Sequence, residues 1–518
     1  MVMARKVERA LVSVFDKTGL DELARGLHEL GIELVASGGT AAFISDLGIP
    51  VTRVEELTDV PELLGGRVKT LHPRIHAAIL ARRDVPADVE ALREHDIEPF
   101  DLVCVNLYPF EHVTAKRNVR EEEAVEMIDV GGPAMLRAAA KNFVDVAPVC
   151  ELGRYERVLG ELRKTGGLGL ETRRELAAEA FSHTAAYEAT IANWFSDRES
   201  FPARLLLALE KQTDLSYGEN PHQRGAYYAE AGARRHLLSR IEQHSGGELS
   251  FNNLNDLDAA RSALREFTVP AVVIVKHANP CGCALASGIE QAYELALAAD
   301  PVSAYGGVVA LNRRVEKPLA DRLTKQFVEV LIAPAYSEEA LEALRVKDSL
   351  RILGDGERRG RTPGERDYRR VLGGMLVQDA DAELDDREGM KVVTVQAPSE
   401  TGWGDLIFAW RVAKHLTSNA IVIAKELQTV GIGGGQTSRV DAVRLAIEKA
   451  RDRGHDLNGA ALASDAFFPF ADGASLALQA GVRGIIQPGG SKRDSEVVEA
   501  VEQAGATMVF ASRRHFRH

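Results

Sequence analysis

The chain has 518 residues, enough for about three domains, and its 45% hydrophobic and 27% charged residues are typical of a globular protein. A formal net charge of −13 argues against a general nucleic-acid-binding protein, because phosphate backbones require a basic surface. There is no bilayer-length apolar run, no signal-peptide pattern and, with four cysteines, no disulfide framework, so we expect a cytoplasmic protein without a membrane or nucleic-acid partner.

Residues 7–150 alternate short apolar runs with helical patterns, which predicts βαβ units on a parallel sheet. The Ala- and Glu-rich stretch 174–195 is expected to be a helix that closes this domain. The polar segment 197–202, which ends in Pro, indicates a boundary, so the first domain should cover residues 1–198.

The rest of the chain contains two similar blocks, at 271–307 and 420–470. Each block has an apolar strand that ends in Lys, then a turn, a helix and a short element of small and aromatic residues. This repetition suggests duplication of one α/β unit. The charged, Gly-rich segment 354–370 is expected to be a solvated connector, so the two halves should cover 199–360 and 361–518.

Two strand-to-helix junctions of the first domain could bind an anion. A glycine turn at a helix N-terminus leaves N–H groups unpaired, and this is the arrangement expected at 37–40. Either junction alone could be an ordinary βα turn, but the two together favour a phosphate pocket. The candidate contacts are Ser13, Lys17, Ser37, Gly38, Gly39 and Thr40.

Further cations and polar groups follow along the first domain. Arg67 and Lys69 are two residues apart, so in an extended segment they would lie on the same side and repel each other unless an anion joins them. The alternative is a pair of solvated surface cations.

Tyr108 closes a strand, where ligands of parallel sheets bind, although it could also be a half-buried packing residue. Arg137 and Lys141 share one face of a predicted helix.

Five motifs occur in a fixed order in this domain: SVFDKTG, ASGGT, GGRVKTLHP, NLYPF and IDVGGPAMLRAAAKN. Together they resemble the IMP cyclohydrolase domain of the bifunctional purine biosynthesis enzymes, a domain with a methylglyoxal-synthase-like fold. The resemblance implies a step that needs no metal or cofactor. The family often has a small hydroxyl residue where this chain has Phe15, so that contact is lost. The resemblance also implies the cyclohydrolase residues Lys69, Tyr108, Asp129 and Lys141, with Arg67, Thr70 and the junction residues holding the nucleotide.

The first block of the second part ends its strand with Lys276 and His277, followed by Asn279. Histidine has the unperturbed pKa nearest to neutrality, and a neighbouring lysine charge lowers it, which favours a neutral imidazole as general base. A structural histidine is the alternative. Cys281 and Cys283 lack both C-x2-C spacing and a second ligand pair, so we predict no metal site.

Taken singly, the other motifs of the second part are weak evidence for a binding site. The Gly-rich segment 431–435 could cradle a phosphate or a pteridine edge, and the terminal RHFRH (514–518) would by itself suggest a frayed tail. In order, however, YGENPHQ, LSFNNLNDLDAA, VKHANPCG, DPVSAYGG, TSNAIVIAK, GGGQTSRV, SDAFFPFADG, IIQPGGSKRD and RHFRH resemble the formyltransferase domain of the same bifunctional family.

This second resemblance implies two zinc-free, cytidine-deaminase-like α/β subdomains and a homodimer with transferase sites at the interface. It implies formyl transfer from 10-formyltetrahydrofolate to the aminoimidazole carboxamide ribonucleotide, followed by ring closure to IMP. Two alternative functions stay open, that of a methylglyoxal-synthase-like enzyme and that of a nucleotide-sensing module.

The same resemblance assigns roles to residues. Lys276 and His277 would transfer protons and Asn419 would orient the formyl group. The family usually has Arg where this chain has Ser216, and Arg224 is the nearest cation in sequence. The implied nucleotide and folate contacts are Tyr217, Asn220, Gln223, Gly307, Arg439, Phe467, Asp472, Arg514, Phe516 and His518.

Overall fold

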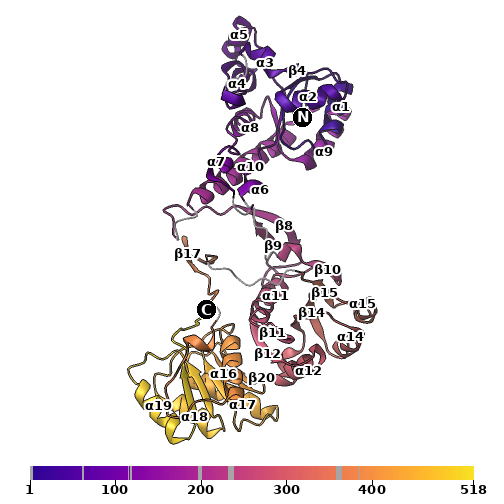
Figure 1. The fold of residues 1–518 in the computed structure, drawn as a ribbon. Coiled ribbons are helices and arrows are strands. Elements are labelled where there is room, and N and C mark those ends of the chain that lie inside the picture. The colour runs from indigo at the N-terminus through magenta and orange to yellow at the C-terminus, as the bar shows by residue number, and fades with distance from the viewer. Residues whose placement is uncertain are drawn as a thin grey trace. The chain divides into compact units, whose positions relative to one another are not determined.

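The computed structural model describes residues 4–60, 64–114, 116, 119–196, 201–231, 238–356, 364–383 and 385–518. The chain divides into two compact units (Figure 1), one made of Met1–Leu209 with Glu230–Gly232 and one of Glu210–Ala229 with Ala233–His518. The predicted boundaries at 198/199 and 360/361 lie outside the described residues. Within the described residues, no helix is long and apolar enough to span a membrane.

The first unit is built on a five-stranded sheet in which every neighbouring pair is parallel, as predicted. The strand order is β4-β3-β2-β5-β6, and nearly all residues of the three central strands are buried. The strands are β2 (Arg9–Ser13), β3 (Glu33–Ala36), β4 (Thr52–Arg53), β5 (Leu102–Val105) and β6 (Ala147–Val149), with a separate pair β1 (Arg5–Lys6) and β7 (Gly167–Leu168).

Helices cover both faces of this sheet, because successive strand residues point to opposite sides. Ala10 and Val12 face a core with α1 and α9, whereas Leu11 faces a core with α4, α8 and α10. The helix expected over 174–195 lies within α10 and is therefore confirmed. The helices are α1 (Leu20–Glu29), α2 (Gly38–Asp46), α3 (Val54–Thr58), α4 (Pro73–Leu80), α5 (Pro86–Glu94), α6 (Phe110–Thr114), α7 (Glu121–Val125), α8 (Gly131–Lys141), α9 (Tyr155–Thr165) and α10 (Leu170–Ser196).

The second unit contains one twelve-stranded sheet, in the order β10-β15-β14-β13-β11-β12-β20-β19-β21-β22-β23-β18. The strands of its first half are β10 (Glu242–Ser245), β11 (Ala271–Lys276), β12 (Asn279–Leu285), β13 (Gly307–Leu311), β14 (Val328–Ala333) and β15 (Arg351–Gly354). Those of its second half are β18 (Lys391–Val392), β19 (Ile421–Lys425), β20 (Gln428–Gly433), β21 (Ala461–Ser464), β22 (Gly484–Gln487) and β23 (Thr507–Phe510).

The strand pairing confirms the duplication suggested by the sequence. In the first half β11 is antiparallel to β12 and β13, β13–β14–β15 are parallel, and β10 is antiparallel to β15. The second half repeats each step, with β19 antiparallel to β20 and β21, β21–β22–β23 parallel, and β18 antiparallel to β23. A single register pair, Ala284 with Gln428, joins β12 to β20 and makes the sheet continuous.

Equivalent helices cover each half of this sheet. One core is shared by α11 (Phe251–Leu264) and α16 (Glu400–Ala413), and on the other face α12 (Ile289–Ala299) and α17 (Arg439–Asp452) each have their own core. The shorter helices are α13 (Pro301–Ala304), α14 (Lys317–Leu323), α15 (Glu338–Arg345), α18 (Ala471–Gln479) and α19 (Asp494–Gln503).

Two glycines of the 431–435 segment have a packing role that the sequence did not reveal. Gly431 and Gly433 belong to β20, and a Cβ on either would lie 2.3 and 2.1 Å from carbonyl oxygens of α17. Gly282 of β12 has the same close approach to α12, at 2.0 Å. These glycines therefore allow each helix to lie directly on its strand.

Two hairpins stand apart from the large sheets, β8 (Leu209–Leu215) with β9 (Gly225–Glu230) and β16 (Arg366–Val371) with β17 (Gly374–Asp379). The segment 354–370, expected to be a solvated connector, is only partly so, because residues 366–370 form most of β16. Most residues of β16 and β17 are exposed.

Candidate active sites

In the first unit, the predicted residues gather at the carboxyl edge of the parallel sheet, where ligands of such sheets bind. Ser13 ends β2 and Ser37 follows β3, and their hydroxyl oxygens lie 2.8 Å apart. Tyr108 comes three residues after β5 and is 43% exposed. The predicted strand-to-helix junctions are therefore confirmed, and they converge at one edge.

Lys69 lies at the N-terminus of α2. Gly38 has a φ of 37°, and a Cβ there would lie 2.9 Å from the Lys69 Nζ, so the glycine makes room for the ammonium group. The same Nζ lies 2.6 Å from a Glu55 carboxylate oxygen. Thr40 is buried, and its hydroxyl donates to the Val14 carbonyl at 3.0 Å, so this side chain ties the two junctions together rather than facing a ligand.

Asp129 and Tyr108 both have raised pKa values. Burial raises the pKa of Asp129. The backbone N–H of Gly132, which donates to the Asp129 carboxylate at 2.8 Å, has the opposite but smaller effect. The pKa of Tyr108 is also raised by burial and by the charge of Asp129, whereas Lys69 lowers it. The charges of Asp129 and Lys69 therefore both act on the Tyr108 hydroxyl. The ring of Phe15, the departure from the family pattern, packs 5.3 Å from the Tyr108 ring.

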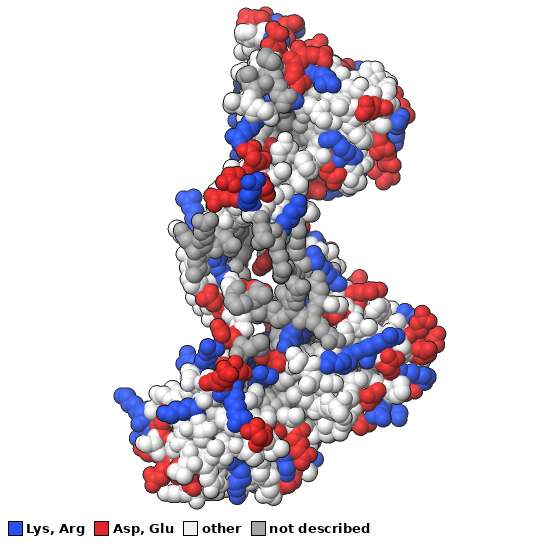
Figure 2. Space-filling view, viewed as in Figure 1, with Lys and Arg blue, Asp and Glu red and all other residues white. Residues whose placement is uncertain are grey.

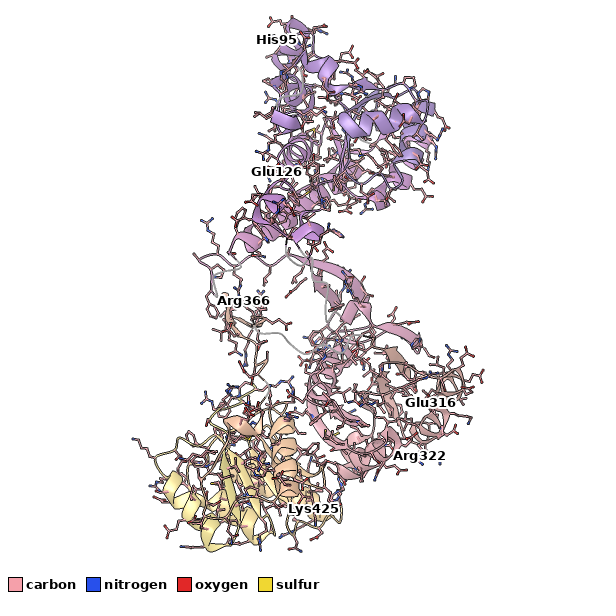
Figure 3. All side chains as sticks on the ribbon, in the orientation of Figure 1. His95, Glu126, Glu316, Arg322, Arg366 and Lys425 are labelled. Carbon is pink, nitrogen blue, oxygen red and sulfur yellow. The ribbon has the colours of Figure 1, made fainter. Side chains whose placement is uncertain are left out.

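The structure does not bring every predicted residue to this edge. The segment 67–70 forms turns rather than an extended strand, so the premise that Arg67 and Lys69 lie on one side is wrong. Arg67 pairs instead with Glu126, an exposed partner labelled in Figure 3. Lys141 is exposed at the last turn of α8, about 15 Å along the helix from its first residue. Thr70 is buried near Gly131, where a Cβ would lie 2.3 Å from its hydroxyl.

In the second unit, Lys276 and His277 stand at the end of β11, as predicted. The Lys276 Nζ donates to the Gly306 carbonyl at 2.6 Å, while the His277 side chain is exposed. Asn279 donates to the His277 carbonyl at 2.9 Å, and its own side-chain oxygen accepts from the Thr417 N–H at 2.8 Å. Asn279 thus ties this corner to the segment that carries Asn419.

Asn419 is oriented by a buried ion pair. Arg439, 8% exposed, donates to the Asn419 side-chain oxygen at 2.5 Å and to the fully buried Asp465 at 2.5 Å. The Asn419 amide nitrogen donates to the Gln436 carbonyl at 2.8 Å. Arg439 was predicted to contact substrate, whereas its bonds here go to protein groups. Asp465 was missed, although the motif containing it was recognised.

The C-terminal tail is anchored, so the frayed-tail alternative is wrong. His515 is 3% exposed and its two ring nitrogens lie 2.6 Å from Asp381 and 2.5 Å from Asp385. Burial alone would lower the pKa of His515, but these carboxylates raise it to about 9. The tail also reaches the Asn419 segment, because the Ser418 N–H donates to the Arg517 carbonyl at 2.9 Å.

Except for Gly307, the remaining predicted contacts lie at exposed or loop positions. Asn220 and Gln223 bond to each other at 2.9 Å in the loop that begins with Tyr217. In the tail, the Arg514 guanidinium stacks 4.4 Å from the Phe516 ring. The others are Gly307, buried at the start of β13; Phe467, 38% exposed; Asp472, in the first turn of α18; and His518, whose ring lies 5.5 Å from that of Phe516.

Comparison with known proteins identifies the family of this chain. The family model for the AICARFT/IMPCHase bienzyme matches residues 139–449, more than half of the chain, and the model for an MGS-like domain matches residues 19–134. The chain belongs to the AICARFT/IMPCHase bienzyme family. This bienzyme has formyltransferase and IMP cyclohydrolase activities, the final two steps of IMP synthesis, and it acts on nucleotide and folate substrates. Its first unit has the methylglyoxal-synthase-like fold that the motifs predicted.

Two solved structures are similar to parts of the bienzyme. The crystal structure of ForH is 40% identical, covering 37% of this chain and 100% of that chain with a TM-score of 0.33. Methylglyoxal synthase from Elizabethkingia anophelis NUHP1 is 19% identical, covering 30% of this chain and 79% of that chain with a TM-score of 0.16.

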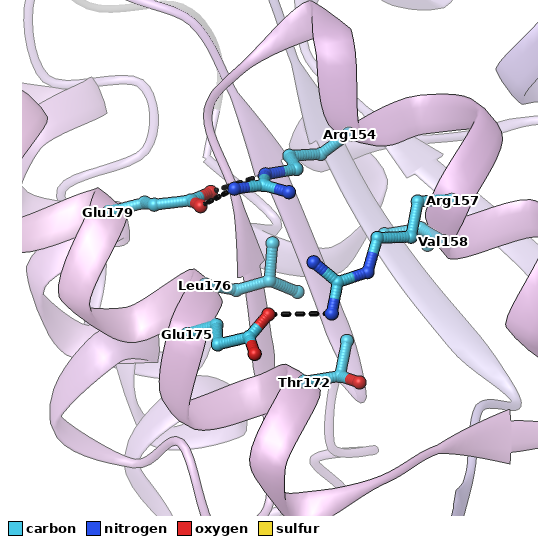
Figure 4. Close-up of a pocket in the computed structure, with 7 residues that line it drawn as sticks. All are labelled: Arg154, Arg157, Val158, Thr172, Glu175, Leu176 and Glu179. Carbon is cyan, nitrogen blue, oxygen red and sulfur yellow. Dashed lines mark hydrogen bonds and ion pairs between the residues drawn. The ribbon is translucent and has the colours of Figure 1, made fainter. Parts of the chain in front are cut away.

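Two hollows of the bienzyme contain none of the predicted residues. One lies between α9 and α10 (Figure 4), where Arg157 donates to Glu175 at 2.6 Å and Arg154 pairs with Glu179, and it leaves no room for a bound water. The other, about 320 Å³, is lined by side chains that include Arg261, Phe267, Asn312, Ile332 and Asp355 of the second unit.

Among the described residues, one group could present three ligand atoms to a metal, with all of them within 4.8 Å of one another: Cys150, Glu151 and His183. Glu151 and His183 already pair at 3.1 Å, and burial raises the pKa of the Cys150 thiol to about 12, which opposes the thiolate that a metal needs.

On the face shown in Figure 2, acidic and basic side chains are interspersed over both units.

Proposed function

We propose that the two reactions of this bienzyme take place at separate sites, formyl transfer at Lys276 and His277 and ring closure at Lys69, Tyr108 and Asp129. The observation that supports the transferase site is the hydrogen bond from the Thr417 N–H to the Asn279 side chain, which connects the Lys-His corner to the segment bearing Asn419. We further propose 10-formyltetrahydrofolate as the formyl donor.

For formyl transfer, the nucleotide amine attacks the formyl carbon while His277 accepts the amine proton. The new C–N bond forms as the bond from the formyl carbon to the folate nitrogen breaks, and His277 returns the proton to that nitrogen. Asn419, held by Arg439, and Lys276, held by the Gly306 carbonyl, stabilise the oxyanion. An amine on an aromatic ring is a weak nucleophile, so positioning supplies much of the acceleration.

For ring closure, the carboxamide nitrogen attacks the formyl carbon and water is then lost. Lys69 stabilises the developing alkoxide while Asp129 accepts a proton from the carboxamide nitrogen and Tyr108 protonates the alkoxide. The resulting hydroxyl leaves as water with the proton held by Asp129, and the formamide nitrogen returns its proton to Tyr108 as the C=N bond forms. The raised pKa of Asp129 makes its carboxylate a stronger base, and the raised pKa of Tyr108 keeps its hydroxyl protonated as a donor. Lys141 has no part in this scheme, because it is exposed at the C-terminal end of α8, whereas Asp129 lies just before the N-terminal end of this helix.

We also propose a cytoplasmic homodimer with the transferase site at the interface. The exposed rings of Phe467 and Phe516, 38% and 41%, support a partner surface near that site. The domain limits proposed are residues 1–198 for the cyclohydrolase and 199–360 and 361–518 for two zinc-free, cytidine-deaminase-like transferase subdomains. Sedimentation equilibrium tests the dimer, and a monomer at micromolar concentration would contradict it.

The assignment of sites is tested with two single variants and two substrates. His277→Ala should lose formyl transfer but still close the ring of the purified formylated intermediate. Lys69→Ala should do the reverse and accumulate that intermediate when given the nucleotide and formylfolate. Loss of both activities in either soluble variant would contradict separate sites.

A further inference from the structure

The turn after β11 has an unusual backbone. His277 and Ala278 have φ values of 53° and 58°, so both lie in the left-handed region, although neither is glycine. Such a conformation is unfavourable for residues with a side chain. The turn that presents the proposed general base therefore needs support from outside the hairpin.

Asp256 of α11 supplies that support. Its Oδ2 accepts from the His277 N–H at 3.3 Å and its Oδ1 accepts from the Ala278 N–H at 2.6 Å. Both N–H groups of the turn thus meet one carboxylate, which lies 21 and 22 residues earlier in the sequence. A single side chain fixes the backbone from which the His277 imidazole projects.

The second half of the same unit repeats the arrangement. Glu426 and Leu427 have φ values of 54° and 58°, and Asp405 of α16 accepts from their N–H groups at 3.0 and 2.7 Å. Because α11 and α16 are equivalent helices of the duplicated unit, Asp256 and Asp405 occupy equivalent positions.

The chemistry at the two turns differs. In the second half, Glu426 stands where His277 stands in the first, and the preceding Lys425, labelled in Figure 3, lies 2.8 Å from Asp456. The second turn thus keeps the aspartate-supported backbone without a histidine. It is an internal copy of the frame in which the lysine is kept and the histidine is replaced by glutamate.

We propose that Asp256 is a positioning residue for formyl transfer, acting through the backbone of His277. This inference rests on the proposed role of His277. Asp256 does not need to touch substrate, because misplacing a base by about 1 Å is enough to slow a reaction about 100-fold. Asp405, which supports the turn without a histidine, has no effect on the same step.

The test compares Asp256→Asn with the matched control Asp405→Asn. Each change leaves one acceptor oxygen and places an amide donor against a backbone N–H. We expect a similar fall in melting temperature for both, whereas only Asp256→Asn should lower the kcat of formyl transfer, by about 10- to 100-fold with KM nearly unchanged. Equal transferase rates in the two variants would overturn the inference.

A rescue experiment separates positioning from a general loss of fold. Ala278→Gly in the Asp256→Asn background removes the Cβ from a left-handed residue, so the turn should recover and kcat should rise. No recovery in a soluble, folded double variant would overturn the inference. His277→Ala gives the independent check, because full transferase activity in that variant would refute the role of His277 itself.

Discussion

The anchoring of the C-terminal tail predicts a pH dependence of stability. The two carboxylates raise the pKa of His515 from its ordinary value of 6.5 to about 9, so the folded state holds a proton that the unfolded state releases between these values. The stabilisation is fully present below pH 6.5 and is lost as the pH rises through about 9. At about 1.4 kcal/mol per pKa unit, it amounts to roughly 3 kcal/mol at most.

Urea unfolding at pH 6.5, 7.5 and 9 measures this effect. Trp403 and Trp410, both buried, belong to the same unit as His515, and Trp194→Phe removes the chain's third tryptophan from the fluorescence signal. The free energy of unfolding of this unit should fall from pH 6.5 to 9, and His515→Gln should be less stable at pH 6.5 with a smaller fall.

The buried His415 provides the contrast on the acid side. Burial lowers the pKa of His415, so the unfolded state binds the extra proton and stability falls below pH 6.5. His515→Gln should leave the part of this acid limb above the ordinary aspartate pKa of 3.8 intact, since below it Asp381 and Asp385 also lose the charge of His515, while it flattens the alkaline limb. An unchanged slope between pH 6.5 and 9 in His515→Gln would refute the assignment of the alkaline limb to the tail anchor.

Three further predictions concern single positions. Gly433→Ala should destabilise the fold by about 1–3 kcal/mol in urea unfolding, because its Cβ would lie 2.1 Å from the Ala442 carbonyl oxygen, whereas Gly404→Ala within α16 should be neutral or stabilising. If Asp129 is the base of ring closure, the acid limb of the pH–rate profile should lie above the ordinary aspartate pKa of 3.8, and Asp129→Asn should lose that limb and the rate. Ser216→Arg should lower the transferase KM for the nucleotide by about tenfold, and an unchanged KM would mean that position 216 does not reach the phosphate.

Local patterns in the sequence determined much of this fold. Alternating apolar runs predicted the parallel sheet, the repeated strand-Lys blocks predicted the duplication, and glycine turns after strands placed the junction at 37–40 at a helix N-terminus. The order of the motifs was sufficient to identify the family. These features depend on neighbours within a few residues, which is why a sequence can reveal them.

Only the tertiary structure decided which side chains meet. His515 and Asp381 lie 134 residues apart in sequence, and no local pattern could show that the terminal RHFRH is anchored rather than frayed. The separate ion pairs of Arg67 and Lys69, the buried Asp465 that holds Arg439, and the Asp256 carboxylate under the His277 turn have the same origin. The buried contacts among these form because packing of distant elements removes water from polar groups that must then be satisfied.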